Sequence, residues 1–110
     1  MNVVDASVGV LTVPLAGEPP QERLSALQLF ADIRAGLMQA HIPDRWADEV
    51  GGALWEAVTR RRLHAYEPRP VRPEEAYGWF MGLLAFADTF MHWHYRDWTP
   101  EEVWAMATVK

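Results

Sequence analysis

Two side chains combine the chemistry and the spacing that a small catalytic or metal site needs, Asp88 and His92. They are four residues apart, so on a helix they share one face and can pair. A histidine held by a carboxylate can act as a general base, and the same two groups can bind a metal ion. A small metal- or histidine-dependent enzyme that uses Asp88, His92 and His64 is therefore one hypothesis. A structural pair without chemistry is the simpler interpretation.

The other chemical groups of the chain do not form a catalytic signature. Cysteine is absent, and the only lysine is Lys110, which argues against thiolate, Schiff-base and phosphate-clamping chemistry. Ser7 and Ser25 lack a nucleophile-elbow motif, and no Gly-rich phosphate loop is present. His94 falls on the apolar side of the predicted helix and is interpreted as a core or interface histidine. We therefore expect no enzymatic activity, no cofactor and no metal site.

A basic patch is predicted where the middle of the chain collects its arginines, at Arg60, Arg61, Arg62, Arg69 and Arg72. Cations at the end of a helix complement the helix dipole, so a solvated helix end explains most of this patch. An acidic partner surface is the alternative. Binding to nucleic acid is disfavoured, because the net charge is −5 and no recognition helix can be identified.

Aromatic side chains are the most prominent feature of the second half of the chain. Nine of the thirteen aromatic residues lie between Tyr77 and Trp104. This surface must be covered by the protein's own helices, by a second copy or by a partner protein. We expect the partner-binding residues to be the exposed subset of Trp79, Phe86, Phe90, Trp93, Trp98 and Trp104.

Four helices are expected to position these groups, over residues 20–40, 45–64, 73–97 and from 100 onward. Leu24, Leu27, Phe30, Ile33 and Leu37 predict one apolar stripe on the first helix. Gly51 and Gly52 inside the second helix predict a close contact or a kink.

Proline and acidic residues open the third helix at Pro73 and the fourth at Pro100, where Thr99 and Glu102 predict a capping box. The third helix is apolar over most of its circumference. Its narrow stripe of small residues, Gly78, Gly82 and Ala85, would let a second copy approach, which predicts a homodimer as the alternative to internal packing.

The chain is expected to be one all-α, four-helix bundle-like domain over residues 20–110, preceded by an N-terminal arm over residues 1–19. The arm is rich in β-branched and small residues and is predicted to be an extended segment or a single β-strand that must pair or dock. No secretory signal and no apolar run long enough to cross a bilayer are visible, so we expect a soluble, cytoplasmic protein.

The segment Trp98–Met106, with the sequence WTPEEVWAM, resembles the short C-terminal helix of some phage tail assembly chaperones. In that family an aromatic residue or glycine precedes Ser/Thr-Pro-x-Glu, an aromatic residue follows, and the helix ends in Leu/Met-Thr. Trp98 and Trp104 match the motif, whereas Ala107 separates Met106 from Thr108. The resemblance covers nine of 110 residues and implies a small helical protein, without catalytic residues, that coats an apolar partner chain.

Taken with the aromatic surface, these observations favour a non-enzymatic, chaperone-like protein that binds an apolar partner, in a phage or mobile-element setting. An acidic inhibitor is the second hypothesis, an immunity or anti-defence protein that blocks a basic nucleic-acid-binding groove. It predicts binding that weakens with salt, whereas an apolar interface predicts binding that tolerates salt.

Overall fold

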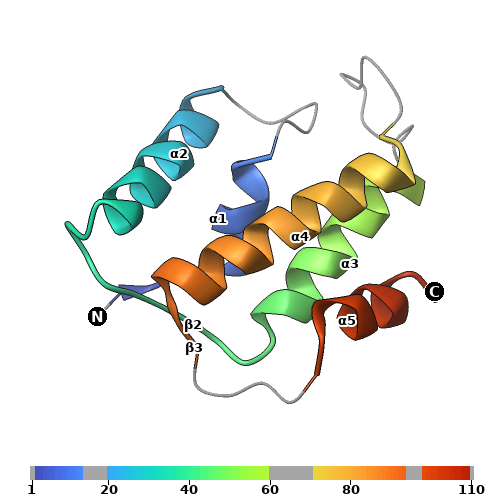
Figure 1. Cartoon of the computed structure of the whole chain (residues 1–110). Helices are drawn as coiled ribbons and strands as arrows, with labels where there is room; N and C mark the ends of the chain where they lie inside the picture. Colours follow the sequence, from blue (N-terminus) through green and yellow to red (C-terminus); the bar gives the residue numbers. More distant parts are fainter. Residues whose placement is uncertain (1, 14–19, 60–70, 94–97, 110) are drawn as a thin grey trace.

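The computed structural model describes residues 2–13, 20–59, 71–93 and 98–109. These ranges are predominantly helical, as expected, with five helices and a small sheet of three strands (Figure 1). In chain order the elements are β1 (Asn2–Val3), α1 (Ala6–Leu11), α2 (Pro20–Arg34), β2 (Ala40–Ile42), α3 (Trp46–Thr59), α4 (Pro73–Phe90), β3 (His92–Trp93) and α5 (Pro100–Ala107).

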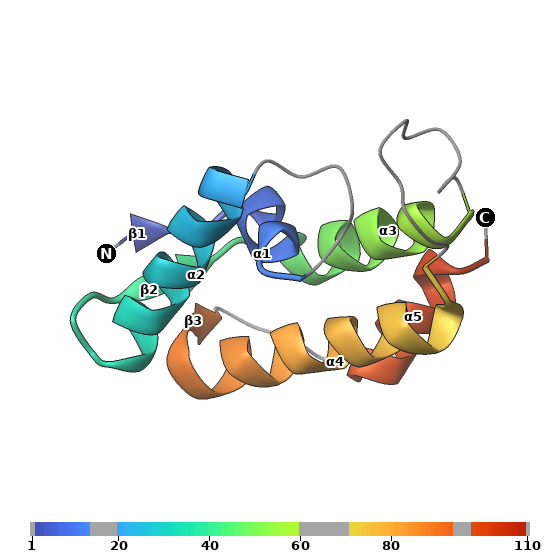
Figure 2. The ribbon, with the colours of Figure 1, turned by 90° about the horizontal axis from the view of Figure 1, so that it is seen from above.

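The helices form a flat arrangement of two layers. Helices α1 and α3 lie above α4 and α5, and α3 runs antiparallel to α4 (Figure 2). The Cα atoms extend over 37 × 33 × 17 Å. Because packed helices have axes 8–10 Å apart, the shortest of these dimensions is that of two helical layers. Helix α2 stands at one side, where α1 lies between it and α3 (Figure 1).

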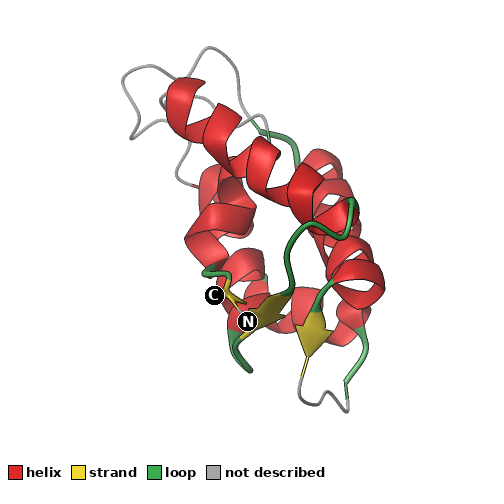
Figure 3. Ribbon diagram, turned by 90° about the vertical axis from the view of Figure 1, so that its left-hand side faces the viewer, coloured by secondary structure: helices red, strands yellow, loops and turns green. Residues whose placement is uncertain are grey.

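The N-terminal arm, predicted to be an extended segment or a single β-strand, begins as a strand. Strand β1 pairs with β2, and β2 pairs with β3, all in parallel (Figure 3). The backbone N–H of Val4 donates to the carbonyl of His41 over 2.9 Å and so extends the β1 pairing. The arm therefore docks by adding a strand, which satisfies the backbone groups that an isolated strand would leave unpaired.

The rest of the described arm differs from the prediction, because residues 6–11 form helix α1. Asp5 caps this helix, since its carboxylate accepts from the backbone N–H and the hydroxyl of Ser7. Gly9 then lets the helix rest against Trp46, because a Cβ at this position would lie 3.0 Å from the Cζ2 atom of that ring. Local capping and contact with a buried tryptophan thus outweigh the β-branched residues of the segment.

The core is one cluster centred on α3 and α4, to which α1, α2, β2 and α5 also contribute buried side chains. Trp46, Val50, Leu54, Phe80 and Leu84 are among its buried side chains. The predicted close contact in α3 is found at one of its two glycines. A Cβ on Gly51 would lie 3.2 Å from the ring of Phe80 and 3.3 Å from the Cβ of Ala107, whereas a Cβ on Gly52 would meet nothing within 4 Å.

Two helices end earlier than predicted. Helix α2 stops at Arg34 rather than near Ala40, because Gly36 adopts a φ of 79° and the N–H of Leu37 donates back to the carbonyl of Asp32. Such a glycine turn satisfies the last carbonyls of a helix and reverses the chain. Helix α4 stops at Phe90 rather than near Asp97. Met91 leaves helical geometry with φ −120° and ψ 160°, and the next two residues pair with β2.

Candidate functional site

The predicted relation between Asp88 and His92 does not hold, because α4 ends between them. Asp88 is exposed on the last turn of the helix, whereas His92 is the first residue of β3. The four-residue spacing that would place both side chains on one helix face therefore no longer applies. His64 and His94 lie outside the described residues.

His92 is instead the neighbour of His41 in the parallel sheet. His41 pairs with His92 in register, and Val3 pairs with His41 on the other side. Registered residues on neighbouring strands project to the same face of a sheet. Ala40 and Ile42 are buried, so the alternate residue His41 projects to the opposite face, where it is half-buried, and its neighbour His92 is exposed. The sheet thus brings together two imidazoles from segments that are 51 residues apart in the sequence.

Sequence reasoning missed His41 altogether. Its only local signal is the pattern Ala40-His41-Ile42, in which a polar residue stands between two apolar ones before Pro43. Such an alternation is typical of a half-buried strand, but three residues are too few to identify one. Among the described residues, no group of three or more histidine, aspartate or glutamate side chains is placed to hold a metal ion.

The aromatic residues mostly pack against one another. Trp104 contacts the rings of Trp55, Tyr77 and Phe80, with centroid distances of 6.0, 5.8 and 5.1 Å. Its ring therefore covers the place where α3, α4 and α5 meet, and its side chain is half-buried. Trp79 is also half-buried against the core.

The remaining aromatic candidates lie toward the other end of α4. Trp93 and Trp98 contact each other, with ring centroids 5.7 Å apart. Phe86 stacks on Phe30 of α2 and contacts Phe90, both at 4.8 Å. Phe90 is 39% exposed, the largest exposed fraction among the six predicted partner-binding residues.

The predicted apolar stripe of α2 is wrong for its leucines. Phe30 and Ile33 are buried as expected, but the helix completes its inner face with Ala26. Leu24 is 64% exposed and Leu27 is 36% exposed. The small side chain of Ala26 is buried on the face of α2 that lies toward Val8 and Leu11 of α1, so the two leucines fall outside that face. Leu37 lies beyond the helix and is also exposed.

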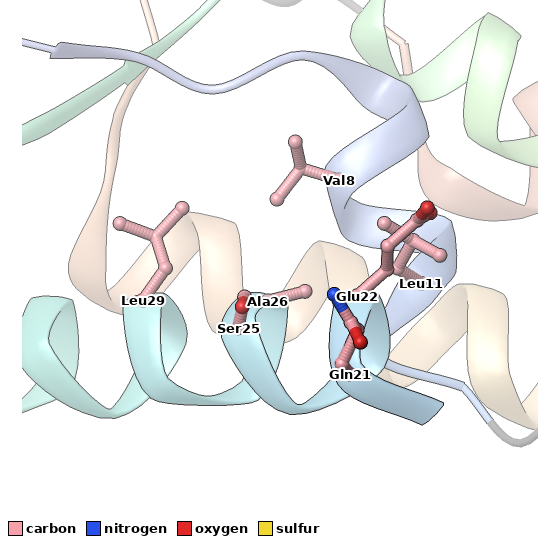
Figure 4. Close-up of a pocket in the computed structure, with 7 residues that line it drawn as sticks. All are labelled: Val8, Leu11, Gln21, Glu22, Ser25, Ala26 and Leu29. Atoms are coloured by element: carbon pink, nitrogen blue, oxygen red, sulfur yellow. The ribbon is translucent and has the colours of Figure 1, made fainter. Parts of the chain in front are cut away.

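A groove lies between α1 and the other flank of α2. Val8 of α1 and Leu29 of α2 point into the space between the two helices (Figure 4). The groove has a volume of about 350 Å³ and is also lined by Leu11, Gln21, Glu22, Ser25 and Ala26. A second hollow of about 370 Å³ between α1 and α3 is more polar, since Asp5, Ser7 and Glu49 line it.

The other predicted surfaces are only partly placed. Of the arginine patch, the structure describes Arg72 alone, whose Nε lies 3.8 Å from Oε1 of Glu75 at the start of α4. Arg60–Arg62 and Arg69 lie outside the described residues. The small-residue stripe of Gly78, Gly82 and Ala85 is exposed on α4, and a Cβ on either glycine would meet nothing within 4 Å.

The comparisons with known proteins add no relative to this description. The chain matches no protein-family model, no curated protein and no solved structure.

Proposed function

We propose that this protein is a non-enzymatic binding protein that holds an apolar segment of a partner protein against the outer face of α2. The observation that carries the proposal is the exposure of Leu24 and Leu27 on a helix whose inner face is already packed. Leucines three residues apart on a helix form a continuous ridge, which is the arrangement that helix-in-groove and helix-on-helix contacts use. We call Leu24 and Leu27 the leucine ridge.

Phe90 is a further exposed apolar side chain near α2. Phe86 of α4 stacks on Phe30 of α2 and contacts Phe90, which is 39% exposed. Aromatic and leucine side chains exposed together are typical of protein-binding surfaces. The resemblance of Trp98–Met106 to tail assembly chaperones supports the same class of function, and a phage or mobile-element setting would agree with it.

The charge of the chain favours a partner with basic flanks over a second copy. The chain carries fifteen acidic and ten basic side chains, a net charge of −5. Two bodies with such an excess of acid repel each other, whereas a basic flank on an apolar segment would be attracted. This acidity also favours the second candidate function, an inhibitor that occupies a basic groove.

A cytoplasmic location belongs to the proposal, since the chain has no cysteine that an oxidising compartment would pair. None of the helices in the described ranges is long and apolar enough to span a membrane.

The test is affinity purification from the native source at low and high salt, with the wild type, the Leu24→Ser/Leu27→Ser double variant and Leu37→Ser. Leu37 is more exposed than either ridge residue and lies outside α2, so it is the matched control. We expect a captured protein that survives high salt, is lost in the double variant and is kept in Leu37→Ser. The captured protein is then purified and its affinity for the three forms measured.

Two outcomes decide against the proposal. Capture that disappears at high salt and does not depend on the leucine ridge would favour the acidic inhibitor, because screened charges would then supply the affinity. Capture that is unchanged in the double variant at both salt concentrations would remove the leucine ridge as the binding surface.

A further inference from the structure

The two registered histidines of the sheet are a second feature with a chemical use, independent of the leucine ridge. His41 is the middle residue of β2, and His92 is the first residue of β3. Neighbouring strands lie about 4.8 Å apart, and registered side chains stand beside each other on one face. The burial of Ala40, Ile42 and Met91 shows that the opposite face is turned toward the core. Both imidazoles therefore share the outer face.

This spacing suits two ligands of one metal ion. A zinc–imidazole bond is about 2.0–2.1 Å long, so two nitrogens on one ion are roughly 3 Å apart. Side chains from strands about 4.8 Å apart can reach that separation by leaning toward each other. Imidazole is a preferred ligand of zinc, copper and nickel, whereas magnesium and calcium prefer oxygen. We propose that His41 and His92 together bind one divalent transition-metal ion of the zinc, copper and nickel class.

The remaining coordination positions of the ion would face outward. Within the described ranges no third histidine or carboxylate joins the pair in a ligand cluster. Water, or a donor from a bound partner, would complete the coordination sphere, as in metal sites that keep an open position.

Binding would also tie together two distant parts of the chain. Residues 40–42 follow α2 and residues 92–93 follow α4, and they are joined by a ladder that is only two registered pairs long. A ligand that binds only the folded state stabilises it in proportion to the logarithm of its free concentration. The ion should therefore raise the melting temperature, and the increase should depend on both histidines.

The experiment uses the full chain without a polyhistidine tag. Zinc chloride is titrated into the wild type, His41→Ala, His92→Ala and His64→Ala by calorimetry, and thermal unfolding is followed with and without zinc. His64→Ala is the matched control, because it also removes one of the four imidazoles of the chain. We expect saturable binding by the wild type and by His64→Ala. We expect a loss of affinity of at least tenfold, on the order of the loss for disturbed metal sites, in each of the other two variants.

Three results would overturn the proposal. They are an absence of saturable zinc binding by the wild type, retention of the wild-type affinity by His41→Ala or His92→Ala, and magnesium chloride binding as tightly as zinc chloride. Circular dichroism checks that the variants are folded. If an alanine variant is not folded, His41→Gln and His92→Gln, which keep a polar side chain on the outer face, take its place with the same expected loss.

Discussion

Asp5 shows how one side chain sets a local structure that the composition of its segment does not favour. Its carboxylate accepts from the Ser7 hydroxyl over 2.6 Å and from the Ser7 backbone N–H over 3.3 Å. The hydroxyl bond and then the backbone bond lower the pKa of Asp5 below its usual 3.8, against a smaller opposing effect of desolvation. A carboxylate whose pKa is lower in the folded state stabilises the fold above the pKa of the unfolded chain. This contribution is lost as the pH falls through the lower, folded value.

The first prediction follows from this loss of stability in acid. Asp5→Asn keeps a residue that can cap a helix but removes the charge, so its melting temperature should lie below that of the wild type at neutral pH. The two melting temperatures should converge as the pH falls from about 4, the pKa of an aspartate in an unfolded chain, through the lower pKa of Asp5 in the folded state. Thermal unfolding by circular dichroism over a series of pH values measures this difference.

Ser7→Ala is the control, because it removes the hydroxyl that has the largest effect on Asp5. In the Ser7→Ala background, the further substitution Asp5→Asn should lower the melting temperature by less than it does in the wild type. A difference that stays constant into acid would show that the charge of Asp5 does not contribute to folding.

Residues whose role is local were predictable from the sequence, and residues whose role depends on distant contacts were not. The Thr99–Glu102 capping box is present as predicted, with the Thr99 N–H donating to Oε1 of Glu102 over 2.7 Å. Its four residues carry the whole signal. His41 has no such signal, because its position beside His92 arises from a strand pairing with a residue 51 positions away.

At the scale of elements, the contact of α3 with α4 and α5 depends on which of two adjacent glycines faces them. Gly52→Ala should raise the free energy of unfolding by up to about 1 kcal/mol, because alanine favours the helix and nothing lies within 4 Å of the new Cβ. Gly51→Ala gains the same helix preference but presses on Phe80 and Ala107. Phe80 is fully buried and cannot move aside freely. We expect Gly51→Ala to be less stable than Gly52→Ala by about 1–3 kcal/mol.

Chemical denaturation of Gly51→Ala, Gly52→Ala and the wild type measures the difference between the free energies of unfolding of the two variants. The positions are adjacent and carry the same substitution, so a general effect of alanine on α3 cancels in their difference. Equal stabilities would mean that the three helices do not approach each other at Gly51 as closely as the structure describes.

The orientation of α2 and the end of α4 were not predictable, for a shared physical reason. On α2, Leu24 and Leu27 have the same three-residue spacing as Phe30 and Ile33, and the packing of α2 against its neighbours decides that Ala26, Phe30 and Ile33 are the buried residues. In α4, no proline or glycine marks the end at Phe90. The helix stops there because the residues after Met91 form hydrogen bonds with β2. A periodic pattern identifies a helix but not its neighbours.

At the scale of the whole molecule, two thin layers leave little room to hide apolar side chains. The core is centred on α3 and α4, whereas α2 at the side of the molecule has one apolar face packed and another exposed. A body of this shape must either tolerate the exposed leucines or cover them with a second molecule. The distinction between core leucines and ridge leucines is therefore the central property of the molecule for its proposed function.

The last prediction tests that distinction. Leu54 is fully buried in α3, so Leu54→Ala should lower the free energy of unfolding by about 2–5 kcal/mol through lost burial and the cavity that it leaves. Leu24→Ser on the exposed face of α2 should change it by no more than about 0.5 kcal/mol.

Denaturant unfolding at several protein concentrations tests whether a second copy of the chain covers the leucine ridge. If copies of this chain covered the leucine ridge, the wild type would become more stable with concentration, and Leu24→Ser would remove that dependence. Stability independent of concentration in both forms leaves the leucine ridge open for a different partner.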